Sequence, residues 1–294
     1  MESKQKGKLY ICGTPIGNLE DITLRSLNIL KTVDLIAAED TRHTRKLLNF
    51  YHIKKPLTSY YEFNKDKKSS LILQHLEKGQ NVALVSDAGM PGICDPGFEI
   101  VNLAIKNGFP VAPIPGVSAL TTALVVSGFD MSRFIFDGFV PRKKSDKLKY
   151  FTSLKDEKRT MIFYESPHRL KDTLGMMLKI MGDRQIVINR ELTKLFEEIK
   201  RGSLSEMINW AGEKELRGEF TLVLEGVRDK KDEKIPPIEN KNIQDEIKKK
   251  MNNYLKKGYY NEDIILLVMK EYGVPKNWVY QKIVDLRKDR KQSS

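Results

Sequence analysis

The sequence predicts an α/β protein whose first half contains a largely parallel sheet. Short apolar runs rich in β-branched residues alternate with segments of helical period. Turns rich in glycine and proline follow several of these runs, where strands of such a sheet end. The 294 residues are enough for two domains and a small additional module.

The first series of elements runs to about residue 118. Its predicted strands are 9–12, 33–38, 82–86 and 111–114, and its predicted helices are 22–31, 42–50, 69–78 and 97–107. Because parallel strands need crossover connections, each helix is expected to cover a face of the sheet.

A second series follows the predicted boundary near residues 128–133. Its predicted strands are 134–139, 160–164, 185–189 and 220–224, with helical stretches that include 170–180 and 204–211. We therefore expect an N-terminal α/β domain over residues 1–128 and a second α/β domain over residues 129–228. The charged, proline-containing segment 229–240 has the composition of a linker.

The tail, residues 241–294, is predicted to be a helical module. Helical patterns at 263–271 and 278–286 are joined by a turn that contains Gly273, as in a helix-turn-helix. Residues 229–294 hold 16 basic and 11 acidic side chains, which supply +5 of the net charge. The tail is therefore a candidate nucleic-acid tether. A helical pair packed on the body or on a second subunit is the alternative.

Composition limits the partners. The chain has 51 Lys and Arg against 39 Asp and Glu, a net charge of +12, which favours an acidic partner such as nucleic acid or indicates only a solvated basic surface. Its two cysteines are far apart and form no metal-binding or disulfide pattern. No signal peptide and no apolar run of about 20 residues is present, so we expect a cytoplasmic protein without a membrane span.

Three turns follow predicted strands of the first series, at 13–18, 87–92 and 115–118. Ligands of such sheets bind at the carboxyl ends of the strands. The first turn lacks both the GxGxxG and the P-loop spacing, which leaves dinucleotide or nucleoside triphosphate binding without support. In the second, VSDAGMPGICDPG, we expect Asp87 to accept hydrogen bonds from a ligand and Asp95 to cap a helix that begins at residue 96. Ser118 either caps its helix or binds the ligand.

The segment AEDTRHTRK, residues 38–46, places Glu39 and Asp40 at a strand end. Four basic residues then fill the start of the next helix: Arg42, His43, Arg45 and Lys46. Basic residues oppose the helix dipole there, so the helix is a candidate phosphate-binding element. The alternative is that the two acids simply pair with the arginines.

Seven segments carry a family resemblance. In chain order they are GTPIGNLEDITLRSL, AEDTRHTRKLL, VSDAGMPGICDPG, PIPGVSAL, FYESPHRL, RELTKLFEEIKRG and GEFTLVLEG. Together they resemble the bacterial small-subunit ribosomal RNA cytidine ribose 2′-O-methyltransferases, a family of the tetrapyrrole methylase superfamily. The resemblance spans about residues 8–227, and the tail resembles the helix-turn-helix-like module of that family.

The resemblance implies two α/β domains of the tetrapyrrole methylase type, with S-adenosylmethionine (SAM) in the crevice between them. It also implies a homodimer, no metal, and 16S ribosomal RNA of the small subunit as substrate. Cys94 stands where a small residue such as serine is expected. By position, the implied cofactor contacts are Pro15, Ile16, Asp87, Ala88, Gly89, Met90, Ile93, Ser118, Ala119, Tyr164, Leu192 and Thr221.

A ribose 2′-hydroxyl is a poor nucleophile at neutral pH, so a general base or strong electrostatic assistance is expected. Glu39 and Asp40 are the first candidates, with Arg42 assisting, and Glu165 and His168 come next. The expected RNA contacts are Arg42, His43, Arg45, Lys46, His168 and Arg169. Two alternatives remain: methylation of a porphyrinoid or a protein side chain on the same scaffold, or an RNA-binding factor without catalysis.

Overall fold

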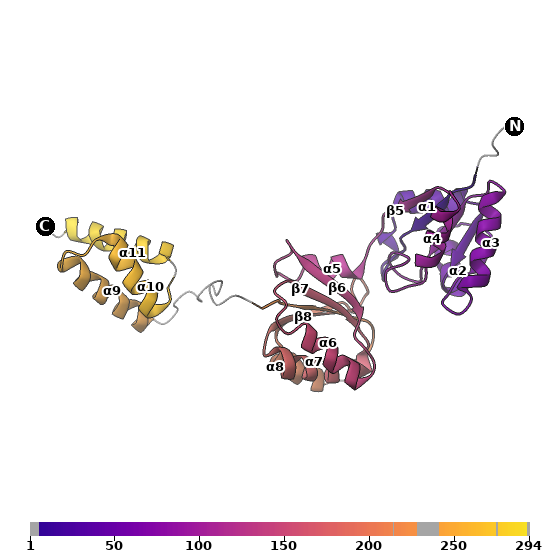
Figure 1. Ribbon diagram of the computed structural model, residues 1–294. Helices are drawn as coiled ribbons and strands as arrows, with labels where there is room; N and C mark the ends of the chain where they lie inside the picture. The colour runs from indigo at the N-terminus through magenta and orange to yellow at the C-terminus, as the bar shows by residue number, and fades with distance from the viewer. Residues whose placement is uncertain (1–5, 214, 228–240, 275, 293–294) are drawn as a thin grey trace. The chain divides into compact units, whose positions relative to one another are not determined.

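The computed structural model of the protein describes residues 6–213, 215–227, 241–274 and 276–292. The chain forms two compact units, Met1–Val227 and Arg228–Ser294. Within these described ranges, the first unit contains two five-stranded sheets and the second contains three helices (Figure 1).

The first sheet is parallel throughout, with strand order β3-β2-β4-β1-β5. Its strands are β1 (Leu9–Cys12), β2 (Leu35–Ala38), β3 (Leu57–Ser59), β4 (Val82–Val85) and β5 (Val111–Ile114). Its helices are α1 (Leu24–Thr32), α2 (Thr41–Phe50), α3 (Lys65–Glu77) and α4 (Phe98–Lys106), with a 3-10 turn η1 (Leu19–Asp21). The four predicted strands and helices are confirmed. β3 was not predicted, because three residues with one large apolar side chain give no detectable period.

Helices cover both faces of this sheet. On β4, Val82 and Leu84 pack in one core with Ile72 of α3 and Ile100 of α4. Ala83 of β4 belongs instead to a core that includes residues of α1 and α2. Burial on both faces explains why these strands are continuously apolar rather than alternating.

The second sheet is mixed, with strand order β6-β7-β10-β8-β9. Its strands are β6 (Phe134–Phe139), β7 (Thr160–Glu165), β8 (Gln185–Arg190), β9 (Glu198–Ser203) and β10 (Phe220–Leu224). Only β6 and β7 are parallel neighbours, and the other pairs are antiparallel. The sequence did not predict β9, an edge strand of sequence EIKRGS with a single large apolar residue.

Residues of the second sheet alternate between two faces. On β10, Phe220, Leu222 and Leu224 pack in a core with α6 (Lys144–Ser153), α7 (Pro167–Met181) and α8 (Leu204–Gly212). Val223 packs on the opposite face in a cluster with α5 (Ala119–Val125) (Figure 1). The connection between α5 and β6 contains the predicted boundary at residue 128.

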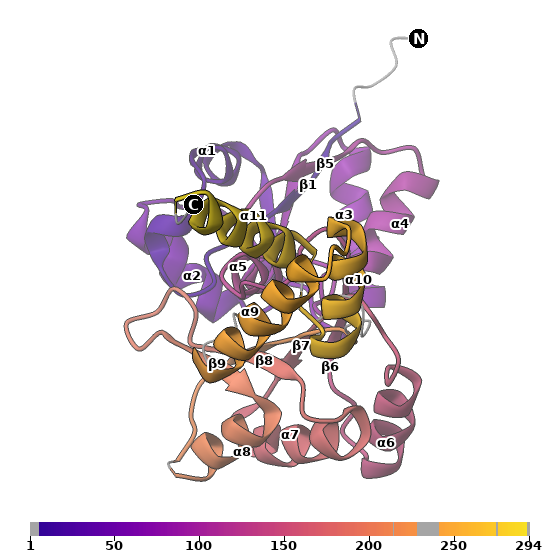
Figure 2. The ribbon, with the colours of Figure 1, turned by 90° about the vertical axis from the view of Figure 1, so that its left-hand side faces the viewer.

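The second unit consists of α9 (Lys241–Lys256), α10 (Asn261–Tyr272) and α11 (Lys276–Gln292), packed against one another (Figure 2). Its core includes Ile247, Ile264, Val268 and Ile283. Gly273 ends α10 with a left-handed backbone, which glycine adopts without steric cost. The two predicted tail helices lie within α10 and α11. The predicted linker falls outside the described residues.

Among the described residues, no helix has both the length and the apolar composition to cross a membrane. Cys12 is buried and Cys94 is exposed, and neither forms a disulfide.

Candidate functional site

The three predicted turns meet because β4, β1 and β5 are neighbours in the first sheet. The Thr14 N–H donates to the Gly89 carbonyl at 2.9 Å, and the Gly89 N–H donates back at 3.0 Å. Gly13 and Gly116 approach so closely that a Cβ on either would lie 2.7 Å from the Cα of the other. Only glycine fits at these two positions without displacing the backbone.

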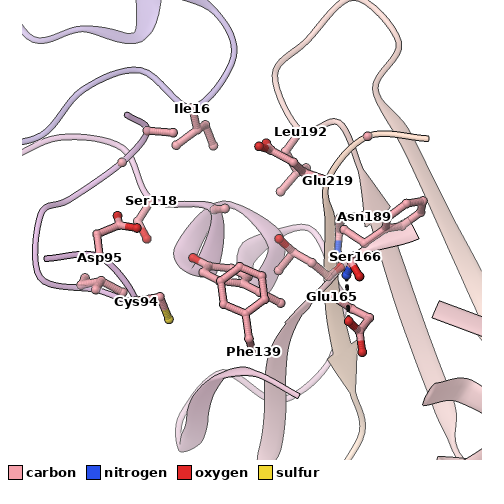
Figure 3. A pocket seen from close by; sticks show the side chains of 18 of the residues that line it. Ile16, Cys94, Asp95, Ser118, Phe139, Glu165, Ser166, Asn189, Leu192 and Glu219 are labelled. Atoms are coloured by element: carbon pink, nitrogen blue, oxygen red, sulfur yellow. Dashed lines mark hydrogen bonds between the residues drawn. The ribbon is translucent and has the colours of Figure 1, made fainter. Parts of the chain in front are cut away.

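A cavity of about 350 Å³ lies against these turns, within the usual size range of ligand pockets. Its walls come from the loops of the first sheet and from strand ends and loops of the second. Figure 3 shows Asp95 and Ser118 on one side of it and Ser166 and Asn189 on the other. The lining residues are Ile16, Ala88, Gly89, Met90, Ile93, Cys94, Asp95, Ser118, Ala119, Phe139, Tyr164, Glu165, Ser166, Pro167, Asn189, Leu192, Gly218, Glu219, Phe220 and Thr221.

One row of side chains across the second sheet forms part of this wall. Thr221 pairs with Tyr164 on one side and with Asn189 on the other. Phe139 extends the row because a bulge in β6 brings it, rather than Gly138, opposite Tyr164. The rings of Phe139 and Tyr164 pack edge to face with centroids 5.5 Å apart.

The wall carries polar atoms that have no partner within the described part of the protein. Asn189 is fully buried, and its Nδ2 donates to the Thr221 carbonyl at 3.1 Å, but its Oδ1 accepts no hydrogen bond among the described residues. The buried Ser166 hydroxyl is likewise unpaired. Because buried polar groups are normally paired, these atoms indicate a place where a ligand or water supplies the partner.

Left-handed backbone occurs on both sides of the cavity at residues other than glycine. Cys94 has φ of 64° beside Asp95, while Glu191 and Thr193 have φ of 52° and 65° on either side of Leu192. Such conformations cost about 1–3 kcal/mol each and are concentrated at functional sites. Here they orient residues that line the cavity.

Ten of the twelve predicted cofactor contacts line this cavity, and Pro15 and Asp87 do not. The Asp87 carboxylate instead accepts the backbone N–H of Asp40 at 3.0 Å. The Asp87 N–H donates to Oε2 of Glu39 at 3.3 Å. Asp87 thereby ties the end of β4 to the turn between β2 and α2.

The prediction that Asp95 caps a helix beginning at residue 96 is wrong. α4 begins at Phe98, with Gly97 at the cap position. Pro96 and Gly97 extend the turn, which leaves the Asp95 carboxyl on the cavity wall. Burial, together with the negative charges of Glu39 and Asp87, raises the pKa of Asp95 to about 7.

The acids proposed first as catalytic, Glu39 and Asp40, do not line the cavity. Asp40 caps α2 through the backbone N–H of Arg42 at 2.8 Å and forms an ion pair with the Arg42 guanidinium at 2.7 Å. These bonds hold the pKa of Asp40 well below its usual range. Burial, followed by the charges of Asp87 and Asp40, raises the pKa of Glu39.

The basic residues of α2 form an exposed face. Arg42, His43, Arg45 and Lys46 are all exposed, and buried Thr44, Leu47 and Leu48 attach the helix to the body. A small hollow of about 140 Å³ beside this helix is lined in part by Arg45, Lys54 and Lys55. The sequence analysis did not single out the two lysines.

The FYESPHR segment separates into residues with different surroundings. The buried Glu165 accepts hydrogen bonds from the Ser166 N–H at 2.8 Å and the Thr173 hydroxyl at 2.6 Å. Arg169 lies 3.3 Å from Glu165 and donates to the Pro141 carbonyl at 2.9 Å, so it is engaged within the fold. His168 is exposed and does not line the cavity.

The sequence analysis missed several wall residues. The sequence indicates a polar strand end at 189–194 similar to FYESPHR, but Asn189 is not among the predicted cofactor contacts. Phe139 depends on a bulge that the sequence pattern does not reveal. Among the described residues, no cluster of His, Cys, Asp and Glu could hold a metal ion.

The chain is similar to known methyltransferases. Residues 8–208 match the family model of the tetrapyrrole (corrin/porphyrin) methylases. A ribosomal RNA small subunit methyltransferase I of Bacillus subtilis is 47% identical over 275 residues, which cover 93% of each chain. The protein of the same name from Thermotoga maritima is 54% identical over 220 residues, which cover 75% of this chain and 99% of that one. A solved cobalt precorrin-4 methyltransferase superimposes with a TM-score of 0.58 at 19% identity, covering 74% of this chain and 94% of its own.

Proposed function

Since the chain belongs to the tetrapyrrole methylase family, and within it to the group of ribosomal RNA small subunit methyltransferases I, we propose that it methylates the ribose 2′-hydroxyl of a cytidine in 16S ribosomal RNA. The methyl donor is SAM. The observation that carries the proposal is the 47% identity maintained over 93% of both chains.

The chemistry of the cavity lining suits SAM. Ile16, Ala119 and Leu192 offer apolar wall to a planar base, and the unpaired Oδ1 of Asn189 offers an acceptor to an amino group. We assign the cofactor to this cavity and keep Pro15 and Asp87 as supports of its loops.

Bound SAM supplies an electrophilic methyl group on a positively charged sulfur, which leaves as a neutral thioether. The protein then has to place one hydroxyl in line with that methyl group and exclude competing water. Positioning of this kind contributes about 7–11 kcal/mol in well-oriented reactions.

The exposed face of α2 is the proposed RNA contact. Arg42, Arg45 and Lys46 can each approach phosphate oxygens, and Lys54 and Lys55 extend the basic surface past Arg45. The Asp40 ion pair holds Arg42 at the start of α2, next to the turn that Asp87 fixes. Arg169 already contacts Glu165 and the Pro141 carbonyl within the fold. Of the two predicted RNA contacts in this segment, His168 is therefore the more accessible.

We also propose that the enzyme acts as a cytoplasmic homodimer on the small ribosomal subunit, and that the helical unit, residues 241–294, tethers RNA. Exposed lysines on that unit, Lys249, Lys256, Lys257 and Lys270, support the tether. The division into domains 1–128 and 129–228 remains a proposal. The proposed boundary lies in the connection between α5 and β6, and α5 packs on the second sheet.

The alternatives have less support. The similarity to a precorrin methyltransferase is at 19% identity, which concerns the fold alone. A non-catalytic RNA-binding factor has no need of a cavity with unpaired polar atoms between two sheets.

The test is transfer of a labelled methyl group from SAM to unmethylated small subunits, to free 16S RNA and to a porphyrinoid, with the modified nucleotide mapped by mass spectrometry. We expect label at a single cytidine ribose. Label only in the porphyrinoid would replace the proposed substrate, and failure to bind SAM in calorimetry would exclude both methyltransferase functions.

A further inference from the structure

We propose that Asp95 is the catalytic residue that accepts the proton from the ribose 2′-hydroxyl, an inference that rests on the function proposed above. Its carboxyl group lies on the cavity wall, on the side formed by the first sheet (Figure 3). Among the described residues, no lysine or arginine forms an ion pair with it. A proton acceptor needs such an unneutralised carboxylate within reach of the reacting hydroxyl.

The other two acidic residues that line the cavity, Glu165 and Glu219, already interact with basic side chains. Both oxygens of Glu165 accept hydrogen bonds, and Arg169 lies 3.3 Å from one of them, so its charge is balanced inside the fold. The Glu219 side chain is 75% exposed and forms an ion pair with Lys194 at 2.9 Å. Both carboxylates are therefore neutralised by a basic partner, unlike that of Asp95.

The acids behind the wall also have other roles. Asp40 is held by Arg42, and Asp87 and Glu39 bond to backbone N–H groups of the two turns. The charges of Glu39 and Asp87 still act on Asp95 and raise its proton affinity. Elimination therefore leaves Asp95 among the acids in and around the cavity.

The groups that face Asp95 come from several elements. Glu39 follows β2, Ser86 and Asp87 follow β4, Cys94 precedes it in its own loop, and Tyr164 lies on β7. Of these groups, the Ser86 hydroxyl lowers the pKa of Asp95, and burial and the two negative charges outweigh its effect. The resulting pKa of Asp95, about 7, suits a group that must gain and lose a proton near neutral pH.

In the reaction, the 2′-oxygen forms a bond to the methyl carbon as its O–H bond breaks. The carbon–sulfur bond breaks with its electron pair retained by sulfur, whose positive charge disappears. The proton passes to a carboxylate oxygen of Asp95, and solvent removes it later. The positive charge lost at sulfur equals the charge released as the proton, so no further reactant is needed.

The first test is Asp95→Asn in the full-length enzyme, with Glu99→Gln as the matched control. Glu99 follows Asp95 by four residues but pairs with Lys65 outside the cavity. At pH 8, with saturating SAM and unmethylated small subunits, we expect the single-turnover rate of Asp95→Asn to fall about 10²–10⁴-fold. Its Kd for SAM should change less than tenfold, and the control should retain both values.

The single-turnover rate of the wild type should rise with pH, with a midpoint near the pKa of Asp95, and then level off. The rate of Asp95→Asn should not show this rise. Asp95→Glu, which restores a carboxylate, should recover part of the rate.

Calorimetry of SAM binding in two buffers supplies a readout that does not depend on turnover. At pH 7 the wild type should release a fraction of a proton on binding the cation, and Asp95→Asn should release less.

A wild-type rate in Asp95→Asn would overturn the assignment, as would a loss of SAM affinity as large as the loss of rate, which would make Asp95 a cofactor ligand. Equal proton release from the two proteins would also overturn it. If the wild type itself methylates no small-subunit RNA, the proposed function fails instead.

Discussion

Asp95 is partly buried beside Glu39 and Asp87, and this environment raises its pKa in the folded protein. The free energy of folding therefore depends on the protonation of Asp95. Its ordinary pKa is 3.8, and the fold raises it to about 7. The native state therefore binds more protons than the unfolded state between these values, and stability falls as pH rises through that window.

This linkage predicts that Asp95→Asn stabilises the protein without ligand at pH 8. The group is partly exposed, so after allowance for solvent screening we expect a gain of about 1–2 kcal/mol. The gain should shrink as the pH falls from 7 towards 4, because residue 95 is then neutral in the native state of both proteins. Thermal unfolding of the two proteins at pH 5 and pH 8 measures it. A gain of equal size at both pH values would contradict the linkage.

The close approach of Gly13 and Gly116 gives a second prediction at this scale. Gly13→Ala should destabilise the protein by about 2 kcal/mol or more, because its methyl group would meet backbone at 2.7 Å. Gly175→Ala is the control, since nothing lies within 4 Å of a Cβ at this position in α7. It should stabilise the protein by about 0.5–1 kcal/mol. Denaturant unfolding measures the change in the free energy of unfolding for each variant. Equal changes for the two substitutions would show that the backbone at Gly13 can shift at little cost.

Among the elements, α2 combines a buried apolar face with an exposed basic one. Phosphate contacts through this helix would hold RNA and leave the cofactor untouched. The segment AEDTRHTRK alone predicts that α2 contacts RNA and not the cofactor, because its helical period and its charges are both visible in the sequence.

We therefore predict that Arg42→Ala and Arg45→Ala each lower methyl transfer to small subunits at least tenfold while SAM affinity stays within about twofold. Lys106→Ala, at the exposed end of α4, removes a positive charge elsewhere and should change neither. Filter binding of RNA and calorimetry of SAM separate the two effects. Equal loss of SAM binding in either arginine variant would place α2 on the cofactor side.

The bounds of helices and strands with a clear hydrophobic pattern were predicted within a few residues. Contacts between residues that are distant in sequence were not predicted. Val82–Val85 is apolar throughout and was recognised as a buried strand. The polar edge strand β9 was missed because its pairing with β8, rather than its own composition, makes it a strand. The Asp95 environment was misread for a similar reason: Glu39 lies far from it in sequence and only the fold brings their charges together.

At the scale of the whole molecule, the two compact units divide the proposed tasks between cofactor cavity and RNA tether. The Thermotoga maritima relative is matched over 99% of its length by 75% of this chain. The unmatched quarter is about as long as the segment from Arg228 to Ser294. A member of the ribosomal RNA small subunit methyltransferase I group thus has about the length of the first unit alone.

Deletion of residues 241–294 should accordingly leave SAM affinity unchanged and weaken RNA association. The slope of log K against log salt should also fall by about 0.7 for every phosphate of single-stranded RNA that these helices neutralise. Binding measured at several salt concentrations tests this. If the truncated protein binds and methylates small subunits like the full-length enzyme, with an unchanged slope, the helices serve packing or dimerisation instead.

The alternation along β10 has an evolutionary consequence. Leu222 and Leu224 maintain the core, Thr221 faces the cavity, and Phe220 borders both. The two sets of positions can therefore change at different rates, because a substitution in one leaves the packing of the other in place. A lineage can exchange residues that line the cavity while the sheet persists. The precorrin methyltransferase shares this fold at 19% identity.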